Sequence, residues 1–128
     1  MLRRALAGCL MLAAAGLATV AAPAAHADFK APYARAAAII DADGSLNESK
    51  NVVRSWRAGT GRYCVQLAHH IDAREALIQL TPRHMLRLPY IAYRHPSATC
   101  RDDNTITVNV YSTHTSRLAD SGFDLLVS

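Results

Sequence analysis

The sequence has 128 residues, with 14 lysines and arginines against 10 aspartates and glutamates, and a formal net charge of +4 at pH 7. This length fits one small domain. Arg3 and Arg4 account for two of the basic residues, so the rest of the chain has twelve basic and ten acidic residues, spread along its length. Nucleic-acid-binding domains cluster their basic residues in a patch or stripe, so this distribution argues against a nucleic acid as the partner.

Residues 1–27 have the pattern of a secretory signal peptide. A basic start, MLRR, precedes the apolar run ALAGCLMLAAAGLATVAA, and Ala25-His26-Ala27 supplies the small residues after which a signal peptidase cleaves. We expect cleavage before Asp28, which leaves a single mature domain over residues 28–128. That domain is then secreted or held in the cell-envelope space, with no membrane attachment. A permanent membrane anchor and lipidation at Cys9 are the alternatives for this segment.

Short stretches with strand character follow one another along the mature chain. Branched or aromatic residues and period-two alternation mark seven of them, with turn residues between: residues 34–40, 50–57, 62–67, 75–80, 86–94, 104–111 and 123–127. This spacing predicts an all-β domain, a small antiparallel β-sandwich or barrel of six to seven strands. A two-turn helix over residues 72–80 is the alternative for the fourth stretch, because Ala, Arg, Glu and Leu favour helix there.

Alternation also predicts which side chains face the core. Tyr63, Val65 and Leu67 share one face of their strand, so Cys64 faces away from the core. In residues 104–111, alternation predicts that Ile106, Val108 and Val110 face inward, whereas Thr105, Thr107 and Asn109 face outward.

Two turns carry glycines, and both resemble binding loops at first sight. Gly59-Thr60-Gly61 lacks the third glycine and the following helix of a dinucleotide-binding loop, and no Lys-Ser/Thr pair makes it a P-loop. We interpret it as a hairpin turn between residues 50–57 and 62–67. The stretch Asp41-Ala42-Asp43-Gly44 fails the EF-hand register, and we interpret it as a turn in which Gly44 takes a positive φ.

The cysteines point to one disulfide. Cys9 leaves with the signal peptide, and an oxidising compartment then favours a bond between Cys64 and Cys100. Closing a loop of this length stabilises a fold by about 4 kcal/mol in the chain-entropy model. Because Cys64 faces outward, the bond is expected to pin residues 96–103 across the outside of the sheet. Two free thiols, or a cysteine paired with a histidine, remain the alternatives.

The segment VVRSWRAGTGRYCV (residues 52–65) is similar to a pattern of roughly GVVSVxRxGTGxYxVxF that recurs in small secreted or surface β domains of bacteria. ADGSL (residues 42–46) and DSGFDLLV (residues 120–127) match its flanking turn and closing strand. The chain therefore resembles this family over nearly all of residues 28–128. Related domains look similar to the β-rich heads of phage-tail-fibre proteins. The shared motifs are turns and core positions, so the resemblance implies a fold and carries no catalytic residue. The family has no assigned activity. Lys50-Asn51 and Cys64 depart from the pattern.

The sequence contains no recognisable catalytic, cofactor-binding or metal-binding motif. No HxH or HExxH spacing occurs among the histidines of the mature chain, which are His69, His70, His84, His95 and His114. Serines lack the context of a nucleophile elbow. The aromatic and arginine residues Tyr90, Tyr93 and Arg94 follow Pro89, which favours an edge strand. Exposed aromatics and arginines at an edge are typical of an interaction surface, and packing in the core or at the edge is the alternative.

These observations favour a secreted, non-enzymatic binding or interaction module with no cofactor or metal. Its partner is expected outside the cell, as a protein or a glycan, and self-association is an additional expectation. The alternative is a small secreted hydrolase, or a protein inhibitor of an enzyme, acting through the loop at residues 94–103 that Cys100 constrains. A histidine–carboxylate pair in a pocket would favour the hydrolase.

Overall fold

A computed structural model describes residues 31–83 and 89–128, which form eight strands and no helix in the part described. The expected signal peptide and the start of the predicted strand at residues 86–94 lie outside the described residues. The strands are β1 (Ala36–Ile40), β2 (Leu46–Lys50), β3 (Val52–Gly59), β4 (Arg62–Leu67), β5 (Ile78–Pro82), β6 (Tyr90–Arg94), β7 (Thr105–Tyr111) and β8 (Phe123–Val127). Among these residues, no helix has the length and apolar character needed to span a membrane.

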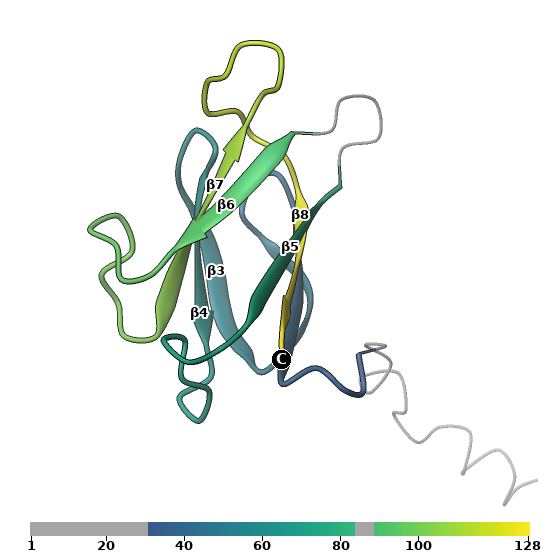
Figure 1. Cartoon of the computed structure of the whole chain (residues 1–128), viewed down its shortest axis with the longest axis vertical. Coiled ribbons are helices and arrows are strands. Elements are labelled where there is room, and N and C mark those ends of the chain that lie inside the picture. The colour runs from purple at the N-terminus through teal and green to yellow at the C-terminus, as the bar shows by residue number, and fades with distance from the viewer. Residues whose placement is uncertain (1–30, 84–88) are drawn as a thin grey trace, which may run out of the picture. The chain divides into compact units, whose positions relative to one another are not determined.

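The strands form two antiparallel sheets of four strands each (Figure 1). Sheet A has the order β2-β1-β8-β5, and sheet B has the order β3-β4-β7-β6. Their inner faces share one core, to which sheet A contributes Ile40, Phe123 and Leu125 and sheet B contributes Tyr63 and Val108. The all-β prediction is therefore confirmed in its sandwich form, with eight strands instead of six or seven.

The additional strand is β2, which the alternation pattern of the sequence did not predict. Its residues, LNESK, are polar because β2 is the edge of sheet A and only Leu46 packs against the core. The predicted strand at residues 50–57 is in fact split at Asn51, whose φ of 55° turns the chain from sheet A into sheet B. Asparagine adopts this left-handed conformation more readily than most residues.

The helix alternative for residues 72–80 is wrong. Residues 73–75 form a turn, and the chain then enters β5 at Ile78, later than the predicted start at residue 75. The period-two prediction for this segment nevertheless holds, because Ala76, Ile78 and Leu80 all pack on the core. Core packing on alternate residues outweighs helix propensity here.

Both glycine turns have the predicted form. Gly44 has a φ of 90°, and its N–H donates to the Asp41 carbonyl at 2.9 Å. Gly61, with a φ of 65°, closes the hairpin between β3 and β4. A Cβ on Gly61 would lie 2.6 Å from the Val110 carbonyl oxygen, so glycine is required there by close packing as well as by conformation.

The Tyr63 hydroxyl joins three segments at this end of the sandwich. It donates to the Ala42 carbonyl at 2.7 Å and accepts from the Ser121 N–H at 3.2 Å. Burial, the largest cause, raises the pKa of Tyr63 to about 12. The ring packs edge-on against Phe123, with centroids 5.4 Å apart, so one side chain serves both the core and the turn network.

Asp120 completes this network from the segment before β8. Its carboxylate accepts from the Gly61 N–H at 2.7 Å and from Arg57 Nε at 3.0 Å. Burial acts to raise the pKa of Asp120, but the hydrogen bonds from Arg57 and Gly61 outweigh it, so the pKa lies below its usual value. The charged carboxylate therefore ties the hairpin turn to the chain that leads into β8.

We expect D120N to weaken the acid dependence of stability. The pKa of Asp120 is lower in the folded chain than in the unfolded chain. Its contribution is therefore present above the unfolded pKa and is lost as pH falls through the folded pKa, below about pH 4. The pair is partly exposed, so D120N should cost only about 1 kcal/mol at pH 7. Urea unfolding at several pH values measures both effects. E75Q, outside the network, is the control, and equal acid dependence of wild type and D120N would contradict the expectation.

Candidate functional site

The predicted disulfide joins Cys64 of β4 to Cys100 of the loop between β6 and β7. Their Cα atoms lie 5.6 Å apart, within the range that a disulfide spans. Cys64 does face away from the core, because its neighbours Tyr63 and Val65 belong to the core cluster. Both cysteines are nevertheless buried, since the loop covers the outer face of sheet B at this point.

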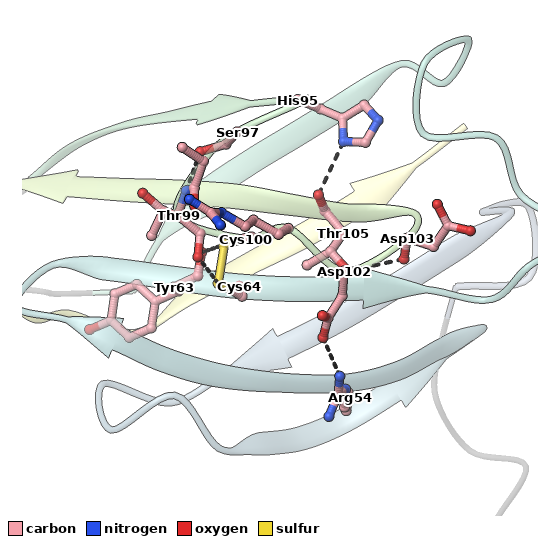
Figure 2. The surroundings of a disulfide bond; sticks show 12 residues. Arg54, Tyr63, Cys64, His95, Ser97, Thr99, Cys100, Asp102, Asp103 and Thr105 are labelled. Carbon is pink, nitrogen blue, oxygen red and sulfur yellow. Dashed lines mark hydrogen bonds and ion pairs between the residues drawn. A yellow bond between two sulfur atoms is a disulfide. The ribbon is translucent and has the colours of Figure 1, made fainter.

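Residues 95–104, here called the disulfide loop, are held to sheet B at several further points (Figure 2). Arg54 of β3 pairs with Asp102, and Gln66 Nε2 of β4 donates to the Asp103 carbonyl at 3.0 Å. His95 Nδ1 lies 3.1 Å from the Thr105 carbonyl oxygen and bonds to it as a donor. The loop is thus fastened to β3, β4 and β7, in addition to the covalent bond.

The disulfide loop changes the surroundings of two predicted outward residues. Thr105 and Thr107 do alternate with core residues, but they are only 0% and 2% exposed. Sequence alternation gives the face of the sheet and cannot show that a distant loop will cover it. Two buried oxygens on this face, Thr107 Oγ1 and Asn109 Oδ1, have no hydrogen-bond partner among the described residues.

A cleft of about 390 Å³ lies between the disulfide loop and the turn at residues 69–74. His69, Asp72 and Arg74 line it from the turn, and His95, Arg101 and Asp103 are among the residues lining it from the loop. Its lining is largely polar, with charges of both signs. Small-molecule sites are mostly apolar with a few placed polar groups, so the cleft departs from that pattern.

Asn104 shapes one side of this cleft, and its role was not predicted. Its side-chain amide donates to the carbonyls of Ala68 (2.9 Å) and Ile71 (2.5 Å), and its side-chain oxygen accepts from the Ala73 N–H at 3.0 Å. Its φ is 56°, which asparagine tolerates. Asn104 falls at the start of the strand predicted at residues 104–111, whereas β7 begins at Thr105, and no local pattern indicates these contacts.

The histidines do not form a recognisable catalytic pair. Within residues 31–83 and 89–128, no hydrogen bond or ion pair links a histidine to a carboxylate, and no group of three His, Cys, Asp or Glu side chains could hold a metal. His69 and His95 line the cleft, whereas His70 packs its ring edge-on against His69 at 5.8 Å. His114 is exposed in the loop after β7, and His84 lies outside the described residues.

The charged residues in the strands of sheet B are all basic. Its four strands contain arginines but no acidic residue. Arg54 and Arg57 are neutralised by Asp102 and Asp120, which come from loops. Arg62 and Arg94 are exposed and make no ion pair in the described part of the chain. Sheet A, in contrast, has Glu48 in β2 and Asp124 in β8.

The residues of the predicted interaction surface all lie on the edge strand β6, but on two faces. Pairing with β7 puts Tyr90 and Arg94 on the outer face, opposite Tyr111 and Thr107 respectively. Tyr93 is paired with the core residue Val108 and so faces the other sheet. Tyr90 is 47% exposed and Tyr93 is 43% exposed. The Tyr90 ring stacks on Tyr111, with centroids 4.7 Å apart and planes 8° from parallel.

Comparison of the chain with protein-family models, with curated proteins and with solved structures finds no match. The candidate sites therefore have to be judged on their own geometry, and the resemblance of the turns to secreted bacterial β domains stays a prediction.

Removing the disulfide should destabilise the domain. The double variant C64A/C100A is expected to lose about 4 kcal/mol of unfolding free energy, because the loop between the cysteines is no longer constrained in the unfolded state. Urea unfolding of the variant beside wild type measures the loss. Wild type treated with a reductant should match the variant, and a variant as stable as oxidised wild type would contradict the expectation.

Trp56, the only tryptophan, reports on the attachment of the disulfide loop. The Arg54 guanidinium lies 4.6 Å from the centre of its ring, in addition to pairing with Asp102. We expect R54A to change Trp56 fluorescence while costing less than about 1 kcal/mol, because the ion pair is exposed. D102N keeps the cation over the ring and should change fluorescence less. Identical spectra for R54A and wild type would contradict this account.

Proposed function

We propose that this protein is a secreted, non-enzymatic binding module whose partner outside the cell carries carboxylate groups. The observation that carries the proposal is the outer face of sheet B next to β6. There, the stacked Tyr90 and Tyr111 lie on the same face as the unpaired Arg62 and Arg94, on strands without any acidic residue. The partner's carboxylates can belong to an acidic protein segment or to an acidic glycan.

The side-chain chemistry of this face supports recognition. Arginine binds carboxylates with two parallel hydrogen bonds, and aromatic side chains supply contact area at a small entropy cost. Tyr90 is already ordered by its stack on Tyr111, so a partner does not have to immobilise it. The strands beneath are fixed on their inner side by the core, and rigid scaffolds of this kind favour binding.

The expected secretion supports the same function. Residues 1–27 have the sequence pattern of an export signal, and the disulfide fits an oxidising space. The protein would meet its partner after export, and Arg62 and Arg94 could then bind an acidic polymer outside the cell.

Binding of two acidic probes tests this proposal. Immobilised protein should bind poly-glutamate, polygalacturonate, or both, more tightly than neutral dextran, and the binding should weaken with added salt. R62A/R94A should weaken binding about a hundredfold, since each of the two charge-assisted contacts contributes about 1.5 kcal/mol and about 1.4 kcal/mol is a factor of ten. Y90A should weaken it as well.

R35A is the matched control, because Arg35 is an exposed arginine before β1 in sheet A. It should bind like wild type. The two probes distinguish a peptide from a glycan as the natural partner. If neither acidic probe binds, or if R62A/R94A binds both unchanged, the proposal is wrong.

A small secreted hydrolase is the second candidate, and its substrate would bind in the cleft beside the disulfide loop, where no histidine is hydrogen-bonded to a carboxylate among the described residues. The cleft brings His69 and His95 together with Asp72 and Asp103 on one concave surface. Ester and peptide substrates turned over by wild type and not by H95A would favour this candidate over the binding module. The same loop is where an inhibitor would present residues to an enzyme.

A further inference from the structure

The edge strand β6 lacks the features that protect the other three edges of the sandwich. β2 is bulged at Asn47, β3 is bulged near Val53 and Ala58, and β5 ends at Pro82. Bulges and prolines hinder the addition of another strand. β6, in contrast, pairs with β7 through five consecutive residues without any shift, and its flanking prolines, Pro89 and Pro96, lie outside the strand.

The backbone of β6 has hydrogen-bonding groups on its free side. Val110 of β7 donates to Gly61 and accepts from Ala119, so both of its backbone groups point away from β6. Hydrogen-bonded and non-hydrogen-bonded pairs alternate along an antiparallel ladder. Ile91, opposite Val110, and Tyr93, two residues on, therefore direct their N–H and C=O groups outward. Neither makes another backbone hydrogen bond in the described part of the chain.

We propose that β6 pairs with β6 of a second copy of this chain, antiparallel, about a two-fold axis that passes beside Ala92. Ile91 then lies opposite Tyr93 of the partner subunit, and Tyr93 lies opposite the partner's Ile91. Each of these pairs exchanges two backbone hydrogen bonds through the groups that point outward. The two copies of sheet B become one continuous sheet, and the interface is isologous, as in most dimers.

The side chains of β6 complement themselves in this register. Tyr90 lies opposite Arg94 of the partner subunit, in a non-hydrogen-bonded pair where side chains approach most closely. One face of the Tyr90 ring is covered by Tyr111, and the other can receive the guanidinium in a cation–π contact. The small, exposed Ala92 lies at the axis, and no like charges meet.

The dimer shares two side chains with the proposed binding surface, because Tyr90 and Arg94 both lie on the outer face of sheet B. The dimer also needs the outward backbone groups of Ile91 and Tyr93, whereas the proposed ligand also needs Arg62 of β4. The two proposals can therefore fail separately, and different measurements report on them.

Sedimentation velocity of the protein as secreted, at rising concentrations up to about 1 mM, tests the dimer. Wild type should shift reversibly from monomer to dimer. A92K places two like charges directly opposite each other at the axis and should weaken the dimer about fivefold or more. Because Ala92 is exposed, the variant should keep the wild-type unfolding transition. Q79K adds the same charge to the exposed edge strand β5 and should leave the dimer unchanged.

A92C tests the register directly, since only a pairing centred on Ala92 brings the two introduced thiols together. It should form a disulfide-linked dimer under mild oxidation, and Q79C should not. A wild-type monomer at every concentration, or an undiminished dimer in A92K, would overturn the inference. Binding of poly-glutamate or polygalacturonate by a wild-type monomer would leave the proposed function standing without it.

Discussion

The covalent bond between β4 and the disulfide loop determines which residues on the outer face of sheet B are buried and which are exposed. Cys64 and Cys100 bring the loop down onto strands whose outward residues, Thr105 and Thr107, are thereby removed from water. The same attachment brings Asp102 to Arg54 and forms one wall of the cleft. The disulfide loop therefore covers part of this face, and Arg62, Tyr90 and Arg94 remain exposed beside it.

Two consecutive residues organise both sides of sheet B. Tyr63 faces the core and fixes the turns at Ala42 and Ser121 through its hydroxyl group, while Cys64 faces outward and fixes the disulfide loop. Alternation along one strand thus connects the packing of the two sheets with the attachment of a surface loop. Because Asp120 also accepts from Gly61, the hairpin turn before Tyr63 is part of the same structure.

Local patterns in the sequence were enough to predict much of the fold and little of the candidate site. Alternation defined β4 and β8 to the residue, since both are central strands with one face in the core. It missed β2, because an edge strand exposes polar residues on both faces. The disulfide followed from there being two cysteines, Cys64 and Cys100, after residue 27. Residues 69–74 and 95–104, which line the cleft, are brought together only by long-range contacts such as those of Asn104, which no local pattern encodes.

The strand order also determines when, during synthesis of the chain, sheet A can form. β8 lies between β1 and β5 in sheet A, yet it follows both in the chain, after every strand of sheet B. Neither β1 nor β5 can complete its pairing before Val127 has been synthesised. A chain still emerging from the ribosome therefore lacks the central strand of one sheet. Sheet A therefore cannot close until translation has passed that residue, however early the strands of sheet B pair.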